Sequence, residues 1–164
     1  MATTKRRAQP MDAIALLKKD HEAVRGLLAQ LERAAAKGGP RAEQLLAKVD
    51  REVKIHSQIE EEIFYPAFRD AATKKDEREL FFEAKEEHHV VDLVMPEVEG
   101  TDSGAEEFAA KAKVLKELIE HHAKEEERQM FPKARKLMDR EELRDLGSRL
   151  KRRKTELQRE QRSE

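Results

Sequence analysis

The sequence predicts an all-α protein with a single core, built from two helical hairpins. Apolar residues recur at alternating spacings of three and four along four successive segments, which is the pattern of helices that bury one face. A group of histidine and glutamate residues at helical spacing also occurs twice, with His56 and His122 at equivalent places 66 residues apart. The composition agrees, because 42% of the 164 residues are charged and only six are glycine and five proline.

Turn-forming residues mark the ends of four predicted helices. The first helix begins near Met11 or Asp12 and stops at Gly38 and Gly39, and Pro40 can occupy the first turn of the second. Residues 72–76 are a polar connection to the third helix. Residues 100–104, with two glycines, form a loop before the fourth. The two hairpins therefore fall on either side of residues 72–76.

The predicted domain organisation is one bundle with a short segment at each end. Residues 1–10 are polar and expected to be disordered, residues 11–138 form the bundle, and residues 139–164 form a charged helical extension. Asp139 and Glu142 have the spacing of a capping box that opens this fifth helix, which runs to about Gln161. Its apolar face has few members, namely Leu143, Leu146 and Leu150, so we expect it to pack lightly or to project into solvent.

Each of the four bundle helices has a histidine near the middle of its apolar face, and two helices add a glutamate four residues later on the same face. An unpaired carboxylate in a core costs several kcal/mol. A dry core also cannot satisfy four imidazoles and two carboxylates through hydrogen bonds among themselves. The pattern therefore predicts a metal site, and the candidate ligands are His21, His56, Glu60, His88, His122 and Glu126.

The polar and aromatic neighbours of these six residues have simpler interpretations. His89 and His121 lie one residue away from the apolar face, about 100° around the helix, and are expected at the surface or its boundary. Tyr65 and Phe131 fall some 180° from His56 and His122 in a regular helix and are predicted to be packing residues, unless Pro66 and Pro132 bend the chain. Four further glutamates belong to charge runs typical of solvated faces: Glu61, Glu62, Glu125 and Glu127.

Composition excludes several classes of function. The net charge is −1, from 34 basic and 35 acidic residues, and the basic runs are short and close to the ends, so no nucleic-acid partner is expected. The absence of cysteine excludes disulfides, thiolate zinc sites and iron–sulfur clusters. No membrane segment or signal-type segment is present, which predicts a cytoplasmic protein. No nucleophile, phosphate-loop or dinucleotide motif indicates a hydrolase, kinase or dinucleotide-dependent enzyme.

Taken together, the motifs resemble those of the hemerythrin-like, or HHE cation-binding, domain family. They are Asp20-His21, the segment from His56 to Pro66, Glu87-His88, and His122 to Glu126 followed by Met130-Phe131-Pro132, and the resemblance covers about residues 11–138. It implies an up-down four-helix bundle that holds two iron ions joined by an oxo or hydroxo bridge. It further implies that Glu60 and Glu126 are bridging carboxylates, that His21 and His56 serve one iron, and that His88 and His122 serve the other.

One position departs from the pattern of the oxygen-carrying members, which have a second histidine on the third helix where this chain has Ala84. The resemblance then implies about one vacancy on each iron. This weighs against a reversible oxygen carrier and favours sensing of dioxygen or nitric oxide, reaction with peroxide, or handling of iron.

Two other interpretations stay open at this stage. One is a passive cation-binding module that holds zinc or manganese or stores iron, since nitrogen and oxygen ligands accept all three metals. The other is an interaction protein with a structural metal, in which residues 139–164 bind a partner or a second copy of the chain.

Overall fold

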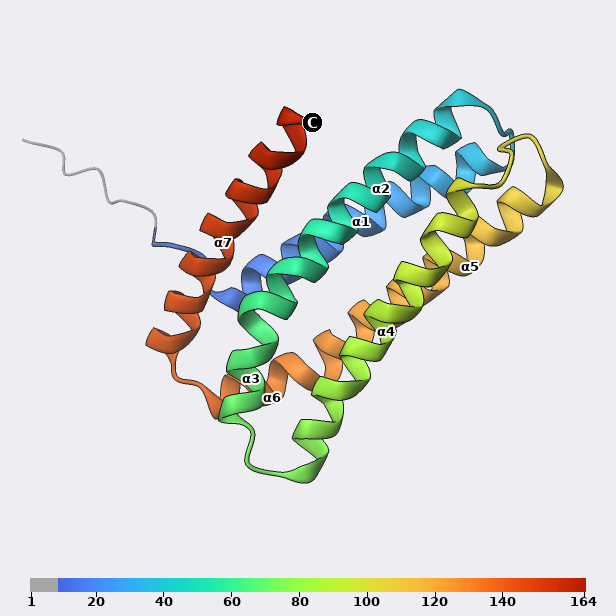
Figure 1. The fold of residues 1–164 in the computed structure, drawn as a ribbon. Coiled ribbons are helices and arrows are strands. Elements are labelled where there is room, and N and C mark those ends of the chain that lie inside the picture. The colour runs from blue at the N-terminus through green and yellow to red at the C-terminus, as the bar shows by residue number, and fades with distance from the viewer. Residues whose placement is uncertain (1–8) are drawn as a thin grey trace, which may run out of the picture.

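The computed structural model describes residues 9–164, and within this range the chain is helical with no β-strand (Figure 1). Most of the segment that we expected to be disordered, residues 1–8, lies outside the described residues. The elements are α1 (Ala13–Ala35), α2 (Pro40–Ile59), η1 (Glu60–Phe64), α3 (Tyr65–Ala71), α4 (Lys75–Glu99), α5 (Glu106–Glu125), η2 (Glu126–Met130), α6 (Phe131–Leu137) and α7 (Arg140–Ser163). Both η1 and η2 are single π-helical turns.

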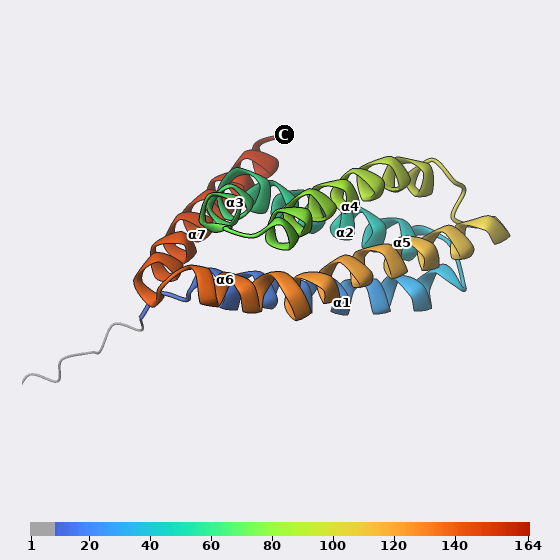
Figure 2. The ribbon, with the colours of Figure 1, turned by 90° about the horizontal axis from the view of Figure 1, so that it is seen from below.

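Four arms form an up-down bundle, which confirms the predicted fold class (Figures 1 and 2). The arms are α1, the continuous helix α2–η1–α3, α4, and the continuous helix α5–η2–α6. Successive arms run antiparallel, and α1 packs on α2 while α4 packs on α5, so each half of the chain is a helical hairpin. None of the helices in residues 9–164 is both long and apolar enough to span a membrane.

The predicted boundaries follow from local chemistry. The Asp12 carboxylate accepts a hydrogen bond from Ala15 N–H at 2.8 Å and caps α1. Gly38 and Gly39 have positive φ angles of 69° and 86°, a conformation that other residues rarely adopt. Asp139 and Glu142 form the predicted capping box, with each side chain accepting the other's backbone N–H at 2.8 and 2.7 Å.

The core consists of two apolar clusters at opposite ends of the bundle. One contains residues from all four arms and from α7, including Leu17, Phe64 and Phe68. The other lies toward the 36–39 and 100–105 loops and includes Leu28, Val49 and Leu115. Apart from Glu77 at the start of α4 and Ser103 in the loop before α5, the buried polar residues lie between the two clusters, at the level where both π turns begin.

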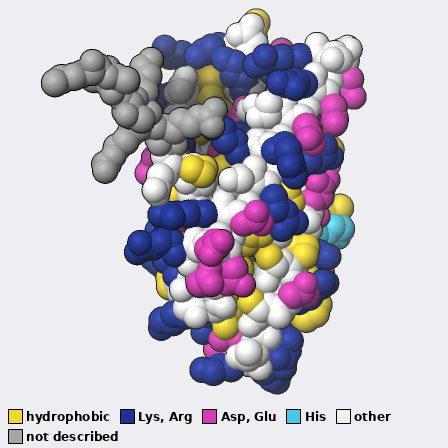
Figure 3. Space-filling view, turned by 90° about the vertical axis from the view of Figure 1, so that its left-hand side faces the viewer, with side chains coloured by type: hydrophobic (Ala, Val, Ile, Leu, Met, Phe, Trp, Pro, Cys, Tyr) yellow, Lys and Arg dark blue, Asp and Glu magenta, His cyan; other side chains and the backbone are white. Residues whose placement is uncertain are grey.

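The C-terminal helix differs from our expectation of light packing or projection into solvent. α7 lies against α1, α2 and η1, and it buries four leucines, including Leu157, which we did not predict (Figure 1). A Cβ at Gly147 would lie 2.2 Å from the carbonyl oxygen of Met11, so only glycine permits this close approach. The face on this side of the molecule carries Lys and Arg side chains interspersed with Asp and Glu (Figure 3).

Candidate metal centre

Six polar side chains from the four arms meet in one buried layer. They are the six predicted ligands, His21 of α1, His56 of α2, Glu60 of η1, His88 of α4, His122 of α5 and Glu126 of η2. Each residue is at most 8% exposed. Helical spacing explains the placement, because a histidine and a glutamate four residues apart share one face, and that face points into the bundle.

The first half of the centre is formed around His21 and His56. Their Nε2 atoms lie 3.1 Å apart. His56 Nε2 lies 3.0 Å from Glu60 Oε1, and His21 Nε2 lies 3.3 Å from Glu126 Oε1. One donor atom from each of these four residues falls within 4.8 Å of the other three, so together they could hold one metal ion.

The second half is formed around His88 and His122, whose Nε2 atoms lie 3.0 Å apart. His88 Nε2 lies 3.2 Å from Glu60 Oε2, and His122 Nε2 lies 3.1 Å from Glu126 Oε1. Glu60 thus presents one oxygen to each half, and Glu126 Oε1 lies close to a histidine of each half. Both carboxylates therefore lie between the halves, where they could bridge two cations.

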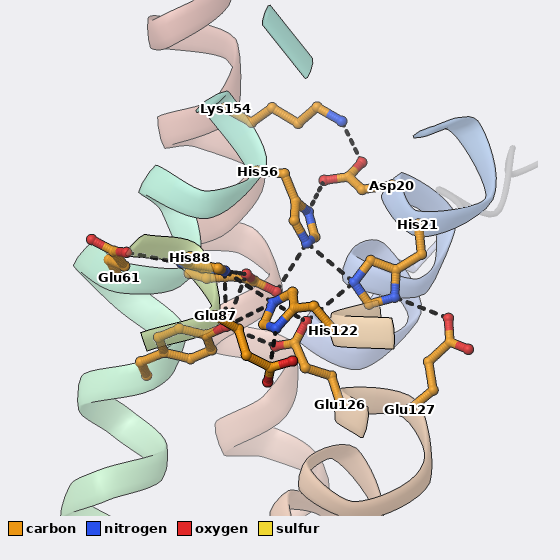
Figure 4. Close-up of polar contacts among 12 residues, drawn as sticks. Asp20, His21, His56, Glu61, Glu87, His88, His122, Glu126, Glu127 and Lys154 are labelled. Carbon is orange, nitrogen blue, oxygen red and sulfur yellow. Dashed lines mark hydrogen bonds and ion pairs between the residues drawn. The ribbon is translucent and has the colours of Figure 1, made fainter. Parts of the chain in front are cut away.

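The outward-facing nitrogen of each histidine contacts a carboxylate (Figure 4). The Nδ1 contacts are His21 to Glu127 at 2.9 Å, His56 to Asp20 at 3.2 Å, His88 to Glu61 at 2.8 Å and His122 to Glu87 at 3.4 Å. A carboxylate on Nδ1 retains the proton there, leaves Nε2 free to bind a metal, and makes the imidazole a stronger donor. We call these four residues, Asp20, Glu61, Glu87 and Glu127, the supporting carboxylates.

The supporting carboxylates correct part of the sequence interpretation. Glu61 and Glu127 were predicted to lie on solvated faces. The Glu61 side chain is 43% exposed, as expected, and Glu127 is half-buried, but both also contact histidines, namely His88 and His21. A signal was present, since each directly follows a candidate ligand glutamate, and Asp20 and Glu87 each directly precede a candidate ligand histidine. The expected exposure of His89 and of His121, which is 66% exposed, is confirmed.

Tyr65 and Phe131 are buried in the core, as expected of packing residues, but their direction differs from expectation, because the π turns rotate both rings toward the layer. In η1 the Tyr65 N–H bonds to Glu60 O, and in η2 the Phe131 N–H bonds to Glu126 O, so each aromatic residue sits nearly above its glutamate. Pro66 follows the first of these residues and Pro132 the second, and a proline has no N–H to continue the α-helical pattern. The two aromatic–proline pairs were the sequence signal for this rotation.

The Tyr65 hydroxyl lies at the centre of the layer. It lies 3.2 Å from Glu60 Oε2 and 3.0 Å from Glu126 Oε2, and it also approaches the Nε2 atoms of His88 and His122 at 3.1 and 3.3 Å. Burial and the two carboxylates raise the pKa of Tyr65 well above its usual value, so in the metal-free protein the phenol keeps its proton. Phe131 stacks on His21 instead, with ring centroids 5.7 Å apart.

The electrostatics of the layer favour cation binding. Burial and Glu126 act to raise the pKa of Glu60, but His56 and His88 outweigh them and hold that pKa below its usual value. Burial acts to lower the pKa of His56, but Glu60 and Asp20 raise it to about 10. The pKa values of His88 and His122 are also raised, so in the metal-free protein protons on these three imidazoles balance the buried carboxylates, and a metal ion can replace them.

The donor set fits a pair of cations. Glu60 Oε1 and Glu126 Oε1 are buried and accept no hydrogen bond from residues 9–164, although histidine nitrogens lie nearby. Buried polar atoms seldom lack a partner, and coordination of a metal ion is one explanation. All the donors are nitrogen or oxygen, as the absence of cysteine requires.

A cavity of about 30 Å³ adjoins the four histidines on the side away from Tyr65. Beyond the histidines, the residues around it are apolar (Val24, Val53, Val91, Ile119 and Ala123) and polar (Arg25, Ser57 and Glu120), but the surface that faces the cavity is mostly apolar. The volume accommodates one or two water-sized molecules.

Comparisons with known proteins agree with this geometry. Residues 12–134 match the family model described as the hemerythrin HHE cation binding domain. A solved structure of a hemerythrin HHE cation binding domain-containing protein from Mycobacterium kansasii is 27% identical, with a TM-score of 0.78 over 90% of this chain and 87% of that chain. A DNA nickase from Nostoc sp. (strain PCC 7120) is 21% identical over 150 residues, which are 92% of this chain and 41% of the nickase. The chain therefore spans less than half the length of that relative.

Proposed function

Because the chain belongs to the hemerythrin HHE cation-binding family, we propose that it is a non-haem di-iron protein that binds or reacts with dioxygen, nitric oxide or peroxide. The observation that carries the proposal is the juxtaposition of a two-cation donor set with a small apolar cavity. His21 and His56 would hold one iron and His88 and His122 the other. Glu60 and Glu126 would bridge them, since each lies close to a histidine of both halves. Bound iron would supply the electron transfer that diatomic ligands and peroxide require.

The cavity supports a small and weakly polar ligand. Its volume of about 30 Å³ suits a ligand the size of one or two water molecules, and its mostly apolar surface solvates an ion poorly. Dioxygen and nitric oxide satisfy both conditions. Peroxide is more polar and would depend on hydrogen bonds from the polar side of the layer.

Tyr65 gives the layer a hydroxyl group beside both carboxylates. Its O–H can donate to Glu60 Oε2 or Glu126 Oε2, and the raised pKa keeps the proton on the phenol oxygen in the absence of metal. We infer that this hydroxyl either holds a proton for a bound ligand or becomes an additional oxygen donor. A bound cation lowers the pKa of a coordinated oxygen acid and so decides between the two roles.

The test is to load the metal-free protein with ferrous iron under anaerobic conditions, measure iron by elemental analysis, and admit dioxygen while recording absorption spectra. We expect about two iron ions per chain and new near-ultraviolet absorption after oxidation. His56→Ala combined with His122→Ala is the matched control and should lose both. Two ions of zinc or manganese with no reactivity toward dioxygen, nitric oxide or peroxide would instead establish the passive cation-binding alternative.

A further inference from the structure

The two halves of the centre differ in the cationic side chains that contact their supporting carboxylates. In the first half, Asp20 contacts the Nζ of Lys154 from α7, and Glu127 receives two hydrogen bonds from Arg25, at 2.9 and 3.1 Å. Lys154, Asp20 and His56 thus form a continuous chain from α7 to the first half (Figure 4).

The supporting carboxylates of the second half have no such cations. No Lys or Arg nitrogen within the described part of the chain lies within 4.0 Å of Glu61 or Glu87. Among the described residues, the imidazoles of His121 and His122 are the basic groups in contact with Glu87. Lys85 acts on Glu61 from beyond contact distance, and the Glu61 side chain is 43% exposed, so solvent screens this interaction. The direct contacts of both carboxylates are therefore with histidines.

This difference in charge changes the electron density on the Nε2 atoms of the histidines. A carboxylate that accepts the Nδ1 proton pushes electron density toward Nε2 and makes the histidine a stronger ligand. A cation on the other oxygen of the same carboxylate withdraws that density. The contact between Asp20 and Lys154 is the stronger case, because the Asp20 side chain is only 9% exposed and solvent screens it little, whereas Arg25 is 30% exposed.

α7 holds Lys154 in this position by ordinary helix packing. Leu150 and Leu157 are buried one turn on either side of it, so Lys154 lies on the face of α7 that meets the bundle. Its basic neighbour, Arg153, bonds to Glu62 at 2.7 Å and links α7 to η1 without touching a supporting carboxylate. Of these two cross-links, only that of Lys154 leads to a candidate metal ligand.

We propose that the centre is electronically unequal, that the His88 and His122 position is the electron-rich one and fills first, and that Lys154 of α7 sets the difference by neutralising Asp20. The inference rests on the proposed function, since it requires that two cations bind. Tyr65 strengthens the same inequality, because its oxygen lies near His88 and His122 while Phe131 provides only a ring beside His21.

Titration of the metal-free protein with Co²⁺ under anaerobic conditions, followed by visible absorption, tests the order of filling. His122→Ala should remove the tighter binding step, and His56→Ala should remove the weaker one. The reverse assignment would overturn the inference. Failure of the parent protein to bind any cation would overturn the proposed function instead, so the two failures are distinguishable.

Lys154→Met tests the role of α7, because it keeps the apolar stem and removes the charge. We expect the weaker step to tighten by about tenfold, the lower end of the range for partners of metal-bound histidines, while Lys154→Arg retains the parent value. The matched control is Arg153→Met, which removes a cross-link of the same helix and should change neither step. An effect of Lys154→Met no larger than that of Arg153→Met would overturn the proposal.

A variant in the other half makes the test independent of α7 packing. Glu87→Gln removes a supporting carboxylate without removing a ligand, and it should weaken the tighter step by about tenfold while the weaker step stays near its parent value. Circular dichroism melting checks that each variant is folded. An unchanged tighter step in folded Glu87→Gln would also overturn the proposal.

Discussion

The two halves of the centre contact different aromatic side chains. In the first half, His21 stacks on the phenyl ring of Phe131, whereas in the second half His88 contacts the hydroxyl of Tyr65. Both halves have the same backbone feature, a π turn that connects a candidate ligand glutamate to an aromatic–proline pair. The repeated motif thus determines the geometry of each half, and single residues around it determine how the halves differ chemically. A duplicated site of this kind can become unequal without losing a ligand.

The largest expected effect is that of metal binding, because a bound cation would replace the imidazole protons that balance the buried carboxylates. Binding that favours only the folded state raises the free energy of unfolding by roughly 4 kcal/mol at a thousandfold excess over Kd. For a chain of this size the melting temperature should rise by about 10 °C, measured by calorimetry with and without ferrous iron. Single variants His56→Ala and His122→Ala should each keep about one ion, and coincident melting curves for metal-free and loaded protein would contradict a buried site.

The pH dependence should distinguish the metal-free from the loaded protein. Because the pKa of His56 rises from 6.5 to about 10 on folding, its contribution to stability is complete below pH 6.5 and is lost as the pH rises toward 10. His88 and His122 act in the same direction, since Glu60 raises the pKa of His88 and Glu126 that of His122 despite burial. The melting temperature of the metal-free protein should therefore fall between about pH 6.5 and 10.

Over the same pH range, metal affinity should increase, because a metal ion must displace the imidazole protons. Isothermal titration calorimetry in buffers of different ionisation enthalpy measures the protons released. His56→Gln, which cannot titrate, is the control. In this variant, the stability of the metal-free protein should fall less steeply as the pH rises. A fall that is equally steep in this variant would mean that His56 does not account for it.

Ala84→His would add a fifth imidazole to the second half, one turn before His88. Ala84 is 4% exposed and belongs to the same apolar cluster as Tyr65, so the larger side chain should cost about 1–3 kcal/mol of stability. In a variant that still loads two irons, we expect slower peroxide turnover and a longer-lived dioxygen adduct, both measured by stopped-flow mixing. Rates equal to those of the parent would show that this position does not control the chemistry.

Tyr65→Phe should make the second half resemble the first. The loss of hydrogen bonds to Glu60 and Glu126 should lower the stability of the metal-free protein by about 1 kcal/mol, measured by urea unfolding. In the loaded protein, the visible spectrum should change if the phenol oxygen is a ligand. Phe131→Tyr, which adds a hydroxyl to the first half, is the reciprocal control. A Tyr65→Phe protein identical to the parent in stability and spectrum would exclude both proposed roles of the hydroxyl.

Much of the fold and the set of buried polar residues could be predicted from local patterns. Helix ends followed from Asp12, Gly38, Gly39 and the Asp139–Glu142 capping box, because caps and positive φ angles depend on neighbouring residues only. The six candidate ligands could be predicted because histidine and glutamate occupy positions on the apolar faces of the helices, where core residues are expected. The structure brings all six into one layer. The roles of these residues as metal ligands remain our proposal.

The features that we predicted wrongly depend on longer-range contacts or on a break in the helical period. An assumption of 100° per residue placed Tyr65 on the far side of its helix, but one π turn rotated it into the centre. The contacts of Glu61 and Glu127 with histidines were missed because their partners, His88 and His21, are on other helices. We underestimated the packing of α7 because the burial of Leu157 and the close approach of Gly147 to Met11 depend on contacts with other helices of the bundle.

The sequence by itself determined the helices, the two-hairpin repeat and the inward face of each candidate ligand, since all three depend on spacing along a helix. Only the tertiary structure decided which carboxylate supports which histidine, where the Tyr65 hydroxyl lies, and that Lys154 reaches Asp20 across 134 positions of the chain. The physical reason is that a helical period determines the direction of a side chain around its own axis. The partner that the side chain meets there is determined by how separate helices pack.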